Sequence, residues 1–132
     1  MAKYVKTEQG YQDIETTVVP VTETKMDKNN PIGTGSFSMG RQPDSVIGDH
    51  SHAEGSWTTA SGSYSHAEGF HTTASGYASH AEGSWTTASG YASHAEGSWT
   101  TASNDDSHAE GYHTIASGSY SHAEGRDTTA SG

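Results

Sequence analysis

The pentapeptide Ser-His-Ala-Glu-Gly occurs six times in this chain, and each copy begins 14 residues after the last, at residues 51, 65, 79, 93, 107 and 121. A unit of this length is too short to bury a core of its own, so neighbouring copies must stack and share one. The repeat therefore predicts a solenoid in which each coil contacts only the coils before and after it.

Composition alone would favour a disordered chain. The sequence has no Leu, 16 Gly and a formal net charge of -10 at pH 7, and low hydrophobicity with high net charge is typical of disorder. The strict register of the six copies argues against that interpretation, because disordered low-complexity tracts rarely keep the same residue at the same position. We therefore expect a folded array.

Each coil consists of two seven-residue halves, such as residues 51–57 and 58–64, and both halves place Ala third and Gly fifth. Small and polar residues alternate and end at the Gly, which predicts a short strand followed by a turn in which positive φ can occur. Seven residues per half leave room for about three or four in each strand. The predicted fold class is all-β, a parallel β-roll solenoid whose facing Ala side chains bring two layers close together.

Stacking at about 4.8 Å per coil places every residue above its counterpart, so that side chains form columns. Two polar columns are expected side by side on one face and are proposed as a structural ladder: His52, His66, His80, His94, His108 and His122, beside Glu54, Glu68, Glu82, Glu96, Glu110 and Glu124. A Thr column and a Ser column, which start at Thr59 and Ser61, follow the opposite strand and are interrupted only by Ile115.

The first 35 residues do not repeat and are predicted to form a small N-terminal head and linker that contains β-strands. The best strand candidates are Tyr4–Val5 and residues 16–22, followed by a turn and linker over residues 29–35. The second domain is the β-roll array, residues 36–132, which we expect to continue beyond residue 132. Its first coil is degenerate, with Phe37 and Met39 at the positions of His and Glu.

The Ser-His-Ala-Glu-Gly half followed by a Thr-Ala-Ser-Gly half, at a period of 14, resembles the head repeats of the trimeric autotransporter adhesins. Related repeats occur in bacteriophage tail fibres. The resemblance covers residues 36–132 and implies a homotrimer in which each chain forms a left-handed parallel β-roll around a threefold axis. The family often has Val and Ile where this chain has His and Glu. We place these two columns at the subunit interface, with a solvent-facing polar stripe as the alternative.

Two functional hypotheses follow from this resemblance. In the first, the chain is a structural trimeric fibre segment of a phage tail or tail-like particle. Its N-terminal head, residues 1–35, docks to the baseplate or another particle protein, and the roll extends toward a host surface receptor. No signal peptide is expected, so the chain would be made in the cytoplasm and located in a virion or extracellular particle. The alternative is the head domain of a bacterial surface adhesin that binds host or matrix ligands.

The acidic charge of the array excludes nucleic acid and anionic lipid as its main partners, because residues 42–132 hold one cation, Arg126, against 11 acids. No membrane insertion is expected. Neither catalysis nor a cofactor is expected, since an active site is normally built once whereas the His and Glu pair recurs six times. The Thr and Ser columns are also compatible with ice binding, a weak signal because hydroxyl columns are common in any narrow roll.

A metal site is a minority hypothesis for His50 and His52, which would present two imidazoles on one face of a strand. Three chains around an axis would offer six nitrogens, an octahedral set that suits iron or nickel. The alternative is that His50 is a polar turn residue beside the first full column.

Aromatic residues concentrate at the turns of the coils, as with Trp57 and Tyr64. They could serve as glycan platforms, but we favour a role in covering the edge of the roll or a neighbouring chain.

The Glu column predicts a pH dependence, because stacked carboxylates repel one another and the adjacent His column is the nearest source of protons. The pKa values of these His residues are therefore expected to be raised in the folded state.

Overall fold

The computed structural model describes residues 4–7, 10–13 and 33–132. Strands β1 (Tyr4–Thr7) and β2 (Gly10–Asp13) pair antiparallel, and β1 confirms the strand predicted at Tyr4–Val5. The strand predicted over residues 16–22 lies outside the described residues. Within the described part of the chain there is no helix that could cross a membrane.

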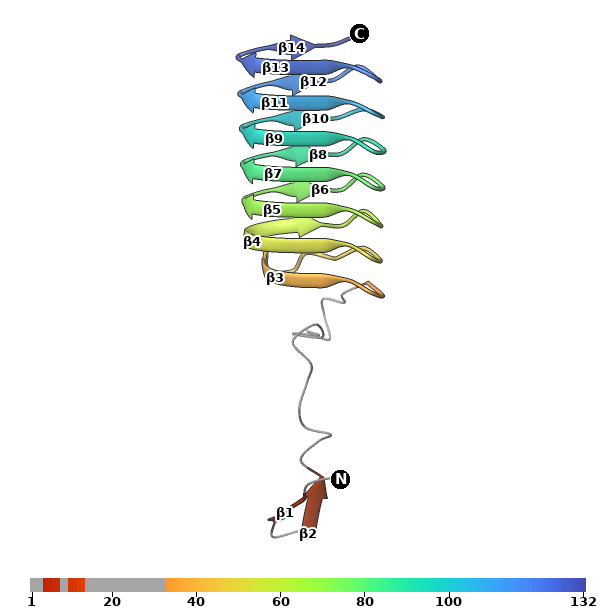
Figure 1. Cartoon of the computed structure of the whole chain (residues 1–132), viewed down its shortest axis with the longest axis vertical. Helices are drawn as coiled ribbons and strands as arrows, with labels where there is room; N and C mark the ends of the chain where they lie inside the picture. The colour runs from red at the N-terminus through yellow and green to blue at the C-terminus, as the bar shows by residue number, and fades with distance from the viewer. Residues whose placement is uncertain (1–3, 8–9, 14–32) are drawn as a thin grey trace.

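Residues 33–132 form a parallel β-solenoid with two sides (Figure 1). The side that we call the long sheet contains β3 (Phe37–Arg41), β4 (His52–Ala60), β5 (His66–Phe70), β7 (His80–Ser84), β9 (His94–Ser98), β11 (His108–Tyr112) and β13 (His122–Arg126). The short sheet contains the end of β4 with β6 (Thr73–Ala74), β8 (Thr87–Ala88), β10 (Thr101–Ala102), β12 (Ile115–Ala116) and β14 (Thr129–Ala130). The predicted β-solenoid of 14-residue coils is confirmed.

Neighbouring coils pair in strict register. His66 lies opposite His80, and the rest of β5 pairs with β7 in the same way. The degenerate first coil joins this register as predicted, with Phe37 opposite His52 and Met39 opposite Glu54. The stack also includes Gly33, whose amide donates to the carbonyl of Ile47 at 2.8 Å, so the first coil begins before residue 36.

The two strands of a coil differ in length, whereas the sequence predicted three or four residues in each. Most long strands have five residues and the short strands have two, as in β7 and β8. The remaining residues of the half with the short strand form a turn that a Ser hydroxyl stabilises. There the Ser79 hydroxyl donates to the carbonyl of Gly76 at 2.7 Å, and Ser65 and Ser93 make the same contact with the glycine three residues before each of them.

The interior of the solenoid is built from small side chains. Eleven Ala residues and Ile47 form the buried hydrophobic core, and most of these Ala side chains have no exposed surface. Columns of buried Ser and Thr, such as Ser79 and Thr86, alternate with the Ala columns. The expected close packing of two Ala-lined layers is therefore confirmed.

Positive φ angles occur near the end of each long strand and again in the turn that follows it. In the coil of β7, Gly83 has φ 116° and Trp85 has φ 59°. The turn of the other half also has a positive φ, which lies at Ala78 (54°) and not at Gly76. The next coil approaches Gly76 closely, and a Cβ there would lie 1.9 Å from the carbonyl oxygen of Gly90.

A second Thr column lies inside the solenoid and could not be recognised from the sequence. Its buried hydroxyls have no hydrogen-bond partner among the described residues: Thr58, Thr72, Thr86, Thr100 and Thr114.

We expect Thr86→Val to raise the free energy of unfolding by about 1 kcal/mol, because Val has the same shape without the polar atom. Ser79→Ala is the matched control and should lower it by about 1 kcal/mol, since this change removes a hydroxyl that is bonded to Gly76. Chemical denaturation at matched protein concentration measures both, and a destabilised Thr86→Val would contradict the prediction.

Candidate functional site

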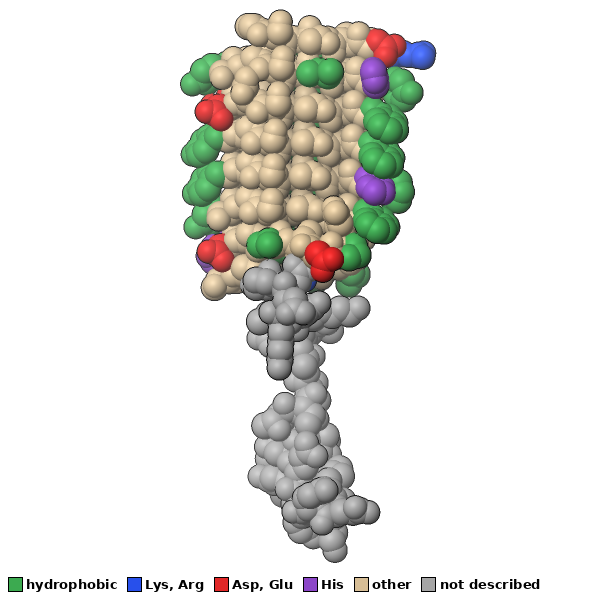
Figure 2. All heavy atoms as spheres, turned by 180° about the vertical axis from the view of Figure 1, so that it is seen from behind, with side chains coloured by type: hydrophobic (Ala, Val, Ile, Leu, Met, Phe, Trp, Pro, Cys, Tyr) green, Lys and Arg blue, Asp and Glu red, His purple; other side chains and the backbone are tan. Residues whose placement is uncertain are grey.

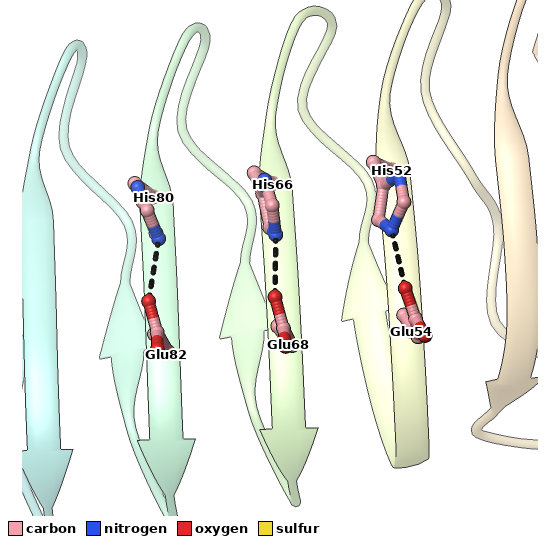
Figure 3. A network of polar contacts seen from close by, with 6 residues as sticks. All are labelled: His52, Glu54, His66, Glu68, His80 and Glu82. Atoms are coloured by element: carbon pink, nitrogen blue, oxygen red, sulfur yellow. Dashed lines mark hydrogen bonds and ion pairs between the residues drawn. The ribbon is translucent and has the colours of Figure 1, made fainter.

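The His and Glu columns lie side by side on the outer surface of the long sheet, which we call the His–Glu face (Figure 3). Strand alternation explains this position, because Ala67 points into the core while His66 and Glu68 on either side of it point outward. His side chains from His52 to His108 are 35–39% exposed and their Glu partners 48–50% exposed. The structure therefore brings together all twelve residues of the predicted ladder.

The imidazole rings of the His column stack on one another. Successive ring centroids from His52 to His122 are 4.7–4.8 Å apart. The ring of Phe37 extends the column at its start, 4.8 Å from that of His52. Each ring is thus covered on its faces by its neighbours, which leaves only its edges to interact with other groups.

The contact between His and Glu within each strand weakens along the column. The distance from His Nε2 to Glu Oε2 is 3.1 Å at His52 and 3.3 Å at His66, and both are hydrogen bonds. It increases to 3.6 Å at His94 and His108 and to 3.8 Å at His122. The Nε2 atoms of His80, His94 and His108 are buried and have no hydrogen-bond partner among the described residues. These three imidazoles are therefore held only by long contacts of 3.5–3.6 Å to their Glu partners.

The predicted rise in the His pKa values is wrong for His94 and His108, where the pKa is lowered from 6.5. Burial is the main cause at both residues, because it disfavours the charged imidazolium. Neighbouring imidazoles lower the pKa further, His80 in the case of His94, and the nearby Glu carboxylates only partly oppose this. The sequence shows the stacked charges but not the loss of hydration at the ring nitrogens.

Lowered His pKa values predict that the solenoid is more stable at pH 8 than at pH 5.5. As pH falls through 6.5, the unfolded chain takes up protons at His94 and His108 before the folded chain does, so folding loses stability. Thermal unfolding followed by circular dichroism should show a higher melting temperature at pH 8. A double variant, His94→Gln with His108→Gln, should show a smaller difference, and a higher melting temperature at pH 5.5 in the parent chain would contradict the account.

The outer surface of the short sheet, which we call the hydroxyl face, is flat and carries Thr and Ser side chains. Figure 2 shows it as a broad area without charged or aromatic side chains along most of its length. Thr73 and Thr87 are paired in register on it, and Ile115 takes the Thr position in β12. This placement confirms that the Thr and Ser columns lie on the strand opposite the His and Glu columns.

An aromatic ladder lies at the turn after each long strand, and we call it the Trp edge: Trp57, His71, Trp85, Trp99 and His113. The rings from Trp57 to Trp99 are nearly parallel, with centroid distances of 5.5, 4.0 and 4.9 Å. Phe70 packs edge-on against His71, and the guanidinium of Arg126 lies 5.5 Å from the Tyr112 ring. The Trp residues remain exposed.

The opposite edge carries a second aromatic series, which we call the Tyr edge: Tyr64, Tyr77, Tyr91 and Tyr120. The rings of Tyr77 and Tyr91 are stacked at 5.3 Å, and Tyr64 meets Tyr77 edge-on. All four residues are exposed, Tyr120 most of all. Asp105 and Asp106 replace the aromatic pattern in one coil, where the Asp105 carboxylate accepts a hydrogen bond from the Tyr91 amide at 3.0 Å.

The stacking of these rings bears on the glycan-platform alternative. A sugar stacks on the face of an aromatic ring, but in the Trp edge His71 and Trp85 cover each other's faces at 4.0 Å and an angle of 5°. The ladder consequently presents ring edges to the outside. This geometry favours contact with another protein surface over stacking with a carbohydrate.

His50 and His52, the residues of the hypothetical metal site, contact different ring stacks. His50 lies in a turn with φ 53° and stacks on Tyr64, with ring centroids 5.3 Å apart. His52 lies at the start of β4, stacks on His66 and bonds to Glu54. Across residues 33–132, no three His, Cys, Asp or Glu side chains are grouped so that they could hold a metal ion.

No family model, curated protein or solved structure matches the chain. The function is therefore inferred from the outer surfaces of the solenoid. Their repetition along the solenoid gives each of them the form of a stripe rather than a single pocket.

Proposed function

We propose that the chain is a structural segment of a homotrimeric fibre in a phage tail or tail-like particle. One observation carries the proposal: the large apolar side chains lie outside the solenoid, whereas the core consists of Ala and Ile47. Exposed apolar surface of this extent marks a site of protein association. A roll with so small a core also gains little hydrophobic free energy against a conformational entropy cost of about 1–2 kcal/mol per residue.

The His–Glu face is the surface that we assign to the trimer axis. The buried Nε2 atoms of His80, His94 and His108 have no hydrogen-bond partner among the described residues and lie 3.5–3.6 Å from the Glu carboxylates of their own strands, which are about half exposed. Phe37 and Met39 begin the two columns, and Met39 is 52% exposed. Hydrogen bonds between copies would satisfy the imidazoles, and the two apolar side chains would be covered.

In this proposal residues 1–35 attach the trimer to the baseplate or to another particle protein, and the roll acts as a stiff spacer toward a host surface receptor. The particle is located outside the cell. The alternative function is the head domain of a bacterial surface adhesin, for which the same exposed stripes would bind host or matrix ligands. The repeated Ser-His-Ala-Glu-Gly motif supports both, because it resembles repeats from both kinds of fibre.

Electron microscopy with antibodies raised against the recombinant protein separates the two functions. Gold label on tail-like particles released by the source bacterium would support the fibre, with label absent after the gene is deleted. Label on the bacterial surface, retained after removal of particles, would support the adhesin and contradict the fibre. A chain that lacks residues 1–35 should keep its β signal in circular dichroism but fail to join the particle.

A further inference from the structure

The two edges of the solenoid differ in ring type and in where their carboxylates lie. Along the Trp edge, the turns from Trp57 to His113 hold no carboxylate, and Asp127 in the next turn forms an ion pair with His113 at 3.3 Å. The Tyr edge contains Asp105 and Asp106, both of which are exposed. Figure 2 shows hydrophobic side chains along both edges, with His and acidic side chains among them on each edge. Both edges therefore have exposed apolar surface to cover.

A second copy of this chain is the partner that fits such an edge over its whole length. The rings of both edges repeat at the spacing of the coils, with centroid distances of 4.9 Å from Trp85 to Trp99 and 5.3 Å from Tyr77 to Tyr91, and the Tyr edge lacks a ring only in the coil of Asp105 and Asp106. A partner surface with a different repeat would align with the side chains of one or two coils and would be out of alignment with the next coils. Another copy has the same period, so each coil of one edge meets a coil of the other.

Symmetry decides which edges meet. In a closed ring of parallel copies, each subunit uses one surface toward its left neighbour and a different surface toward its right neighbour. The Trp edge and the Tyr edge lie on opposite sides of every coil and provide two such surfaces. An isologous contact, with like edges together, would pair two copies and would not close a ring of three.

We infer that the Trp edge of one copy packs against the Tyr edge of the next copy in the trimer, an inference that rests on the proposed homotrimer. Rotation about an axis parallel to the rod keeps each residue at its own height. The turn that contains Asp105 and Asp106 connects the coil of Trp99 to the coil of His113, so its height lies between them. The carboxylates of one copy thus lie level with the rings of Trp99 and His113 in the neighbour.

Cross-linking between engineered cysteines tests this contact, and the sequence has no natural Cys to interfere. Ser84→Cys places a thiol on the Trp edge beside Trp85, and Ala92→Cys places one at an exposed position on the Tyr edge beside Tyr91. The full-length double variant, treated with a short bifunctional maleimide, should give a covalent species of three times the chain mass. Each single variant should stay uncrosslinked, because the same edge never meets itself in a ring.

Light scattering and circular dichroism on the untreated variants establish that they keep the mass and fold of the parent chain. A covalent dimer from either single variant would show like edges in contact and overturn the inference. The absence of cross-links from the double variant, with a trimer still seen by light scattering, would also overturn it while leaving the proposed homotrimer intact. A folded monomer in light scattering would contradict both.

Discussion

Gly83→Ala is expected to lower the free energy of unfolding by about 3 kcal/mol or more. Two costs combine at this position. The φ of 116° is a conformation that residues with a Cβ rarely adopt, at a cost of about 1–3 kcal/mol. A Cβ would also lie 2.0 Å from the carbonyl oxygen of Gly97 in the next coil, so the backbone must move. Chemical denaturation monitored by circular dichroism measures the loss.

Two neighbouring positions serve as controls for Gly83. Gly76→Ala should cost less, because this residue has no positive φ and its column already accepts Asn104 in a later coil. Ala78→Gly should be neutral or slightly stabilising, since Ala78 has φ 54°, where a Cβ is unfavourable and Gly is not. Equal stability of the Gly83→Ala variant and the parent chain would show that the coils do not approach each other as closely as the structure has them.

Ala81→Leu should destabilise the solenoid by about 3 kcal/mol through overpacking of the core. Ala81 has no exposed surface, and it lies in register between Ala67 and Ala95 in the coils on either side. An isobutyl group at this position must push the long and short sheets apart, because close-packed interiors contain few voids. Thermal and chemical unfolding should both shift to milder conditions.

Thr87→Ile is the matched control for Ala81→Leu, since it also adds apolar volume to the same region of the chain. Thr87 points outward on the hydroxyl face, and Ile115 already occupies the same column two coils later. We expect a change within about 0.5 kcal/mol. Equal losses of unfolding free energy from both substitutions would contradict the placement of Ala81 in the core and Thr87 on the outer surface. A loss only at Ala81 supports this placement.

Much of this fold can be predicted from the sequence because the repeat fixes the register. The 14-residue period is enough to place His66 opposite His80, and alternation is enough to separate Ala67 from its polar neighbours. The relative lengths of the two strands could not be predicted, because they depend on the hydroxyl turn that Ser79 closes on Gly76. The positive φ of Trp85 could not be predicted either, since Trp has no intrinsic preference for the left-handed region.

The residues of the candidate site could be predicted from the sequence, but the direction of their pKa shifts could not. The columns of His and Glu follow from spacing alone. The direction of the pKa shift at His94 does not, because it depends on how far stacking between His80 and His108 removes the ring nitrogens from water. The ring stacking of the Trp edge also needed the structure, since the sequence places Trp85 on a turn without fixing the orientation of its ring.

The mass of the full-length chain in solution tests the account most directly. Size-exclusion chromatography with multi-angle light scattering should give three times the chain mass of 13.8 kDa, at concentrations where circular dichroism shows β structure. The trimer should dissociate only together with loss of the β signal, because the core of a single roll is Ala and Ile47. A stable, folded species of 13.8 kDa would contradict the trimeric fibre and the contacts inferred between its edges.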